Sequence, residues 1–188
     1  MDSRVYHILN QLAGRADWLD HLLRWTAQGL PLLLGGLVVS AWFWPGSAQQ
    51  RGQRQRLVVY ALTAALLGLA VAQVMGHVWF RERPYVHHPA HLLLAPSGDP
   101  SFPSDHAVGA FGLAVPFLLA RRRLAWPLFV LASLLALVRV AAGTHYPSDV
   151  LGGAVVGSAA AVAVWSVRPR LERLLAPCLL LARRLRLA

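Results

Sequence analysis

The stretch LVVYALTAALLGLAVAQVMGHVWF, from Leu57 to Phe80, decides the fold of this chain. It contains no arginine, lysine, aspartate or glutamate. At a rise of about 1.5 Å per residue, a helix of this length crosses the roughly 30 Å hydrocarbon layer of a bilayer. The stretch therefore predicts a transmembrane helix, and with it a membrane protein.

The rest of the chain has the same character. Of its 188 residues 56% are hydrophobic and only 14% are charged, whereas a soluble domain carries about 25% charged residues. Further apolar runs cover residues 29–44, 107–120, 124–142 and 150–167, separated by a polar, basic loop at 46–56 and by a Pro-, His- and Ser-rich loop at 81–105. We expect a single domain over residues 1–188, an all-α integral membrane helical bundle of about five to six spans.

The two ends of the chain are less apolar than its middle. Residues 1–26 mix apolar side chains with balanced charges, which is typical of interfacial amphipathic helices. Residues 29–167 hold the membrane spans. Residues 168–188 are basic and rich in leucine, which predicts a cytoplasmic tail that lies on the membrane surface.

All 18 basic residues are arginine, and they give the chain a net charge of +10. Most of them lie in clusters at 51–56, 121–123 and 168–186, each beside an apolar run. Such clusters mark the cytoplasmic ends of spans, so the charge indicates membrane topology and not a nucleic-acid partner. With these clusters inside, the loop at 81–105 and the turn at 143–149 both face outward, as do the N-terminal helices.

Three polar stretches lie at the ends of apolar runs and therefore on this outer face. They are Arg83-Pro84, then Pro103-Ser104-Asp105-His106, then Arg139 followed by His145 and Asp149. A guanidinium fork matches two phosphate oxygens, and the N-terminus of a helix favours an anion. The three stretches together predict a site for a phosphate group. Taken singly, Arg139 could instead reach the outer headgroups, and Arg83 could be an ordinary loop charge.

His145 and Asp149 are the pair that indicates catalysis. They are four residues apart, so on a helical turn they share a face, and the carboxylate can fix the tautomer of the imidazole. The other ring nitrogen is then free to attack phosphorus. His106 lies beside Ser104 at a helix start and suits a general acid that protonates the leaving oxygen.

The sequence also repeats Pro-Ser-Asp, at residues 103–105 and 147–149. Serine and aspartate are strong helix N-caps, so we expect a cap at both places. His77 either lines the cleft or is a buried core histidine, and Arg81 is expected to support the site together with Glu82. Because no cysteine or carboxylate completes a ligand set around His87, His88 and His91, we expect neither a metal site nor a cofactor.

The order Arg-Pro, Pro-Ser-x-His and Arg-x5-His-x3-Asp resembles the type 2 phosphatidic acid phosphatase superfamily, whose active site is similar to that of vanadium haloperoxidases. The motifs span Arg83 to Asp149, and the pattern of spans extends the likeness over residues 29–167. The run GHVWFRERP at 76–84, with Pro-Ser-Asp-His and Thr-His-Tyr-Pro-Ser-Asp, looks like the bacitracin-resistance branch, the undecaprenyl-diphosphate phosphatases.

The resemblance implies a role for each matched residue. His145 becomes the nucleophile that forms a phosphohistidine, Asp149 orients it, and His106 donates a proton and later activates water. Arg83, Arg139 and Ser104 bind the phosphate.

The resemblance also implies a place and a substrate. The enzyme would lie in the bacterial inner membrane with its active site on the periplasmic face. It would act on a polyprenyl diphosphate among the membrane lipids, with no obligate protein partner. Phosphatidic acid, phosphatidylglycerophosphate and lipid A are alternative substrates, and a non-catalytic binder or transporter of anionic lipid is the alternative from another class.

The chain departs from the family pattern in its first motif. The position that usually holds lysine, seven residues before Arg83, is Gly76, and the chain contains no lysine. We expect Arg81 or His77 to supply the missing phosphate ligand. In addition, Val138 stands where serine is frequent, and Asp105 stands where glycine is frequent, which places a carboxylate beside an anionic substrate.

Overall fold

A computed structural model describes residues 2–174 of the chain. Within this range all the regular secondary structure is helical, with no strand. Its helices are α1 (Asp2–Asn10), α2 (Asp17–Phe43), α3 (Ala48–Val78), α4 (Pro84–His87), α5 (Asp105–Leu119), α6 (Ala125–Ala141) and α7 (Pro147–Ser166). The predicted all-α bundle is confirmed.

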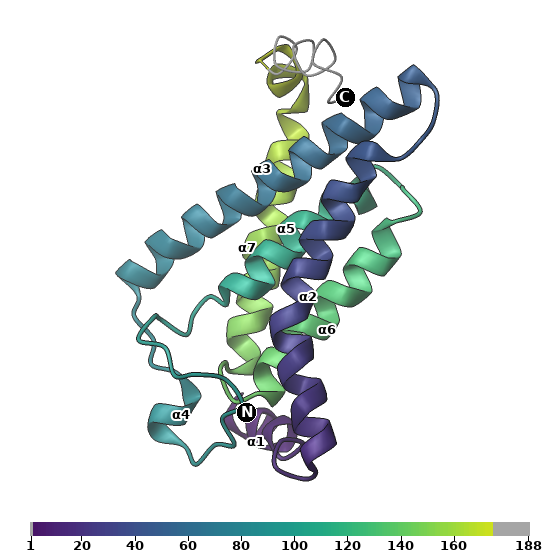
Figure 1. Cartoon of the computed structure of the whole chain (residues 1–188). Coiled ribbons are helices and arrows are strands. Elements are labelled where there is room, and N and C mark those ends of the chain that lie inside the picture. The colour runs from purple at the N-terminus through teal and green to yellow at the C-terminus, as the bar shows by residue number, and fades with distance from the viewer. Residues whose placement is uncertain (1, 175–188) are drawn as a thin grey trace.

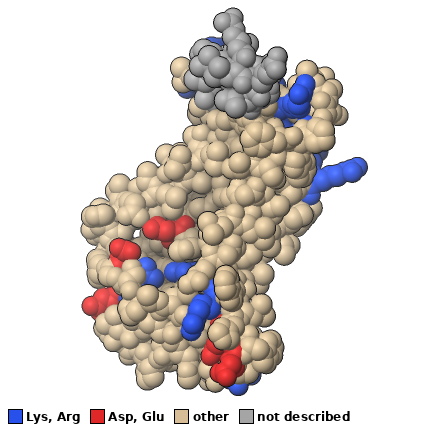
Figure 2. Space-filling model, in the orientation of Figure 1, with Lys and Arg blue, Asp and Glu red and all other residues tan. Residues whose placement is uncertain are grey.

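Five of these helices are apolar, and three of the five have the length of a membrane span. Helices α2, α3 and α7 are long and apolar enough to cross a bilayer, and α5 and α6 are shorter apolar helices. Their outward faces carry large hydrophobic side chains, such as Leu32, Leu66 and Val155, that water would disfavour and lipid accommodates. Figure 2 shows a broad uncharged belt, with charged atoms around a hollow near one end of the molecule and again toward the other end.

Two boundaries differ from the sequence-based prediction. Helix α2 begins at Asp17 and not at Gly29, so the second half of the predicted interfacial segment is the first part of a span. Helix α3 begins at Ala48, inside the predicted basic loop, because Ser47 and Gln50 form a reciprocal capping box. Arginine has a high helix propensity, so a basic segment that follows a good cap continues the helix. Most of the predicted surface tail lies outside the described residues.

Small residues bring α3, α5 and α7 close together. A Cβ atom added at Gly153 would lie 2.6 Å from the carbonyl oxygen of Ser104, and one added at Gly157 would overlap the carbonyl oxygen of Val108. A Cβ atom added at Gly112 would lie 2.8 Å from the Cα atom of Ala65. In lipid, close backbone packing of this kind is what joins helices, since lipid tails are as apolar as leucine.

The helix directions place the polar stretches at one end of the bundle. Helices α3 and α6 end there, and α5 and α7 begin there (Figure 1). Helices α1 and α4 lie at the same end, beneath the bundle as drawn in Figure 1. The arginine-rich first turns of α3 and the described arginines that follow α5 and α7 lie toward the opposite end (Figure 1). The two charged regions are therefore separated by the length of the bundle.

Candidate active site

The second and third polar stretches are joined directly. The backbone N–H of Ser104, at the start of α5, donates to the carbonyl oxygen of Asp149, in the first turn of α7, over 3.0 Å. The two Pro-Ser-Asp segments therefore face each other at neighbouring helix starts. Only the first has the expected cap position: Ser104 is the N-cap residue of α5, whereas Tyr146 is that of α7.

His145 lies in the turn between α6 and α7, with 2% of its surface exposed. Its Nδ1 atom is 2.9 Å from the carbonyl oxygen of Ser101 and 3.8 Å from Oδ2 of Asp149. A carbonyl oxygen only accepts, so Nδ1 carries the proton and Nε2 keeps its lone pair. We expected the carboxylate to fix the tautomer. In the structure the backbone carbonyl of Ser101 is the nearer acceptor of the Nδ1 proton, and Asp149 interacts with the same ring from farther away.

Asp149 is fully buried, and its carboxylate accepts three hydrogen bonds. Oδ2 accepts from the hydroxyl of Ser101 at 2.5 Å and from the N–H of Tyr146 at 2.8 Å. Oδ1 accepts from Nη1 of Arg81 at 2.6 Å. Three donors hold this buried carboxylate in one orientation, from which its negative charge can stabilise positive charge on His145.

Arg83 reaches His145 from the other side. Its Nε atom donates to the carbonyl oxygen of Asp99 over 3.1 Å, and its Nη1 atom donates to that of Thr144 over 3.3 Å. These bonds hold Nη1 3.5 Å from Nε2 of His145. A phosphoryl group bound by this guanidinium lies next to the ring nitrogen that carries the lone pair.

Arg139 and Ser104 complete the polar lining. Arg139 is 8% exposed and Ser104 is fully buried. In the part of the chain that the structure describes, neither Arg139 Nε nor Ser104 Oγ has a hydrogen-bond partner. Buried polar atoms without partners are costly, and phosphate oxygens would accept from both. The site thus offers donors from three elements to one tetrahedral anion.

The surroundings keep His145 neutral. Burial lowers the pKa of His145 below its usual value of 6.5, and the positive charges of Arg83 and Arg139 lower it further, against the opposing effect of Asp149. A neutral imidazole is the nucleophilic form. The same arginines that could hold a phosphate therefore favour the neutral form of His145.

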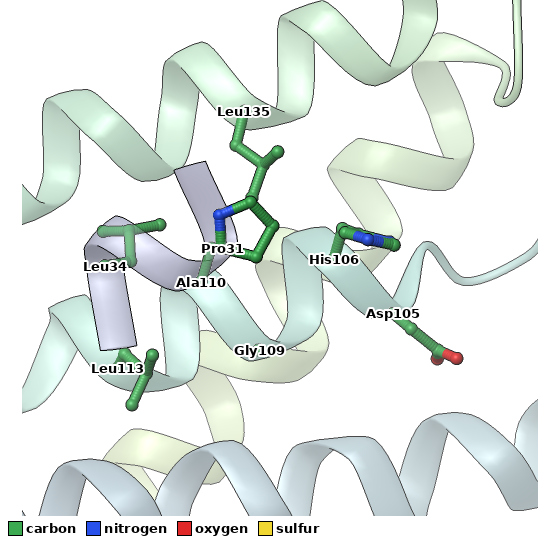
Figure 3. Close-up of a pocket in the computed structure, with 8 residues that line it drawn as sticks. All are labelled: Pro31, Leu34, Asp105, His106, Gly109, Ala110, Leu113 and Leu135. Atoms are coloured by element: carbon green, nitrogen blue, oxygen red, sulfur yellow. The ribbon is translucent and has the colours of Figure 1, made fainter. Parts of the chain in front are cut away.

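His106 lies one residue into α5 and within electrostatic reach of Arg83, Arg139 and His145. It also lines a cavity of about 260 Å³. Beyond Asp105 and His106 the cavity is lined by apolar residues of α2, α5 and α6, namely Pro31, Leu34, Gly109, Ala110, Leu113 and Leu135. Figure 3 shows Asp105 and His106 at one end and Leu34 and Leu113 at the other. A polar centre beside an apolar slot suits a lipid with a charged head.

The first motif lacks the phosphate ligands that we expected as replacements for lysine. A Cβ atom at Gly76 would lie 3.1 Å from Cγ of Pro100, so this position has little room for any side chain. The Nη1 and Nη2 atoms of Arg81 are bonded to Ser148, Asp149 and Asp2. His77 is exposed, and its Nδ1 atom lies 2.7 Å from the carbonyl oxygen of Gln73. Arg81 therefore supports Asp149, and His77 stands on the outer surface of α3.

The histidines of the 81–105 loop have other contacts. His87 pairs with Glu82, and the ring of His88 packs against those of His7 and Tyr146. Asp105, which we expected to disfavour an anion, accepts a hydrogen bond from Gln73 over 3.0 Å.

Sequence reasoning missed three participants. Ser101 bonds both His145 and Asp149, Thr144 bonds Arg83 and Arg139, and Asp2 bonds Arg81 and Ser148. Ser101 and Thr144 act partly through backbone carbonyls, which every residue has. For Asp2 the sequence contains no local signal, since its partners are far along the chain.

Known proteins are similar to this chain in both sequence and fold. Undecaprenyl-diphosphatase BcrC of Bacillus subtilis (strain 168) is 30% identical over 156 residues, which are 83% of this chain and 78% of the relative. A decaprenylphosphoryl-5-phosphoribose phosphatase of Mycobacterium tuberculosis is 35% identical over 156 residues, 82% of this chain and 77% of the relative. The relatives also include lipid A 1-phosphatases, which match 51% and 66% of this chain. The crystal structure of Aquifex aeolicus LpxE superposes with a TM-score of 0.73 at 22% identity, over 88% of this chain and 94% of that one.

The fold is a helical membrane bundle with two buried arginines, a buried histidine and an apolar cavity beside His106, which is the arrangement expected of a membrane-embedded lipid phosphatase. Residues 57–173 match the model of the PAP2 superfamily. The chain belongs to this superfamily, and the motifs recognised in its sequence fall inside the matched region.

Proposed function

We propose that the protein removes the terminal phosphate of a polyprenyl diphosphate, of the undecaprenyl type, and leaves the lipid monophosphate. The single observation that carries the proposal is the placement of His145: its Nδ1–H is held by a carbonyl oxygen, and its Nε2 lies 3.5 Å from the Arg83 guanidinium. The relative named undecaprenyl-diphosphatase supports the choice of substrate.

The proposed reaction has two steps. In the first, Nε2 of His145 attacks the terminal phosphorus and the bond from phosphorus to the bridging oxygen breaks. His106, which must be protonated in the complex with the anionic diphosphate, gives that oxygen its proton. The lipid monophosphate leaves, and the phosphoryl group stays on His145. In the second, His106 takes a proton from water, the hydroxide attacks phosphorus, and inorganic phosphate leaves His145. Arg83, Arg139 and Ser104 hold the phosphoryl oxygens throughout, and Asp149 balances the positive charge on the ring.

The cavity beside His106 is the proposed place of the first isoprene units. Apart from Asp105 and His106 at one end, the cavity is lined by apolar residues of α2, α5 and α6. The arginine-rich segments lie at the opposite end of the bundle, and by the positive-inside rule this supports a site on the outer face of the cytoplasmic membrane. The diphosphate then meets the arginines at the outer surface while the tail stays in lipid.

The test ranks purified lipids by kcat/KM in detergent with excess chelator. Polyprenyl diphosphate is expected to exceed polyprenyl monophosphate, phosphatidic acid, phosphatidylglycerophosphate and lipid A, and the chelator is expected to leave its hydrolysis intact. A higher kcat/KM for any of the others would reassign the substrate.

Variants of two histidines test the nucleophile and the alternative of a non-catalytic binder. His145→Ala is expected to lose turnover and the acid-labile, histidine-linked label that terminally ³²P-labelled substrate leaves on wild-type protein. His87→Ala, an exposed histidine that contacts Glu82, is the matched control and is expected to keep both. Binding of the diphosphate without turnover by the wild type would favour a lipid binder or transporter.

A further inference from the structure

Helix α1 crosses under the turn that carries His145 and is attached on both sides of it. At its first residue, Oδ1 of Asp2 accepts from the backbone N–H of Ser148 at 3.0 Å, and Oδ2 accepts from the Ser148 hydroxyl at 2.5 Å. At its last residue, Nδ2 of Asn10 donates to the carbonyl oxygen of Ala141 over 2.9 Å. One helix thus connects the end of α6 with the start of α7.

The middle of α1 packs on the same turn. Tyr6 is fully buried, and its ring centre is 5.7 Å from that of Tyr146, the residue next to the nucleophile. Asn10 also pairs with His91, through its Nδ2 to the carbonyl oxygen and through its Oδ1 from the N–H, each at 3.0 Å. Helix α1 is therefore fixed to the 81–105 loop as well as to the bundle.

Asp2 is connected to the catalytic carboxylate through Arg81. Nη2 of Arg81 is 2.8 Å from Oδ2 of Asp2, and Nη1 is 2.6 Å from Oδ1 of Asp149. The guanidinium also lies 4.2 Å from the centre of the Tyr146 ring. Because a guanidinium is planar and rigid, its position against Asp2 determines where its other nitrogen meets Asp149.

The charges of Asp2 and Asp149 explain why Arg81 is paired with both carboxylates. Hydrogen bonds from Ser148 and Arg81 lower the pKa of Asp2 despite its partial burial, so it is ionised at neutral pH. Arg81 without Asp2 would be a full positive counter-charge for Asp149 alone, and would be drawn toward it. Asp2 shares that charge, which leaves more of the negative charge of Asp149 for the His145 ring.

We propose that Asp2 is a positioning residue of this enzyme: by holding Arg81 it sets the orientation and the effective charge of Asp149, and so the reactivity of His145. This inference rests on the proposed role of His145 as nucleophile. Asp2 itself contacts neither the phosphate-binding atoms nor the cavity. Replacing Asp2 should therefore lower kcat and leave KM unchanged.

The main test is Asp2→Asn, compared with Asp20→Asn as the matched control. Asp20 bonds the backbone N–H of Gly14 at 2.8 Å, in the segment between α1 and α2, and does not contact Arg81. We expect Asp2→Asn to lower kcat by roughly 10-fold, since small displacements of catalytic groups are costly, with KM unchanged. Asp20→Asn should keep the wild-type kcat. Equal losses from both variants would mean general loosening of α1 and would overturn the proposal.

A double-variant cycle with Arg81→Gln tests the route of the effect. If Asp2 acts through Arg81, adding Asp2→Asn to Arg81→Gln changes kcat by less than about twofold, because residues in one network are not additive. Losses that multiply would overturn the proposal, as would a wild-type kcat for Asp2→Asn or a raised KM with kcat unchanged.

Asp2→Glu keeps the test decisive if Asp2→Asn does not fold. It retains the charge but displaces Arg81, so its kcat should lie below the wild-type value at unchanged KM, and a wild-type kcat would refute the inference. The cycle can be run on whichever lipid phosphate the wild type hydrolyses. A wrong choice of substrate therefore shows up in the ranking of lipids, and a wrong role for Asp2 shows up in the cycle.

Discussion

Replacing Asp149 by asparagine separates two roles that a carboxylate beside a histidine can have. In this structure the carbonyl oxygen of Ser101 holds the Nδ1 proton of His145, and Asp149 contributes charge from 3.8 Å away. Asparagine removes the charge while the carbonyl keeps the tautomer. The variant is therefore expected to be impaired and not inactive.

The size of the loss follows from the distance. A full negative charge 3.8 Å from the ring stabilises an imidazolium-like transition state by at most about 4 kcal/mol at an effective dielectric constant of about 20. That ceiling corresponds to roughly 10³-fold in rate. Arg81, bonded to the other oxygen, offsets part of the charge. We therefore expect kcat to fall by about 10²-fold.

The assay is phosphate release at saturating substrate, with His145→Ala measured beside Asp149→Asn and folding checked by thermal unfolding in detergent. A loss as complete as that of His145→Ala would show that Asp149 sets the tautomer and would refute the role of the Ser101 carbonyl. A wild-type rate would show that the charge of Asp149 is not used.

Two further predictions concern pH and packing. Burial and two arginines lower the pKa of His145, so its neutral form persists as the pH falls. After correction for ionisation of the substrate phosphate, we therefore expect the acid limb of kcat/KM below pH 6.5. An acid limb at or above pH 6.5 would contradict the electrostatics of the site. Gly157→Ala overlaps the Val108 carbonyl and is expected to destabilise the protein by about 1–3 kcal/mol. Gly109→Ala, where an added Cβ meets nothing within 4 Å, is its control and should stabilise α5 by about 0.5–1 kcal/mol. Chemical or thermal unfolding in the same detergent measures both, and equal effects would mean that the close approach of α5 and α7 is not real.

Much of the fold could be predicted because bilayer thickness imposes a length and an apolar composition on every span. The apolar runs of α3, α5, α6 and α7 were found this way. The start of α2 could not be found, because its first turns carry Asp17 and Asp20 and look interfacial, yet they continue the helix. The start of α3 depended on a capping box at Ser47, which the basic composition of the segment concealed.

The candidate site likewise has features that could be predicted from the sequence and features that could not. Residue type and order were enough to predict the class of protein and the set of side chains, since hydropathy, charge and motif spacing depend on nothing else. Arg83 and Arg139 lie within electrostatic reach of His145, and Ser104 bonds the backbone of Asp149. Only the tertiary structure decided which contacts do the positioning, because a backbone carbonyl such as that of Ser101 belongs to every residue type, and because Asp2, Arg81 and Asp149 are brought together by the path of the chain and not by any local pattern.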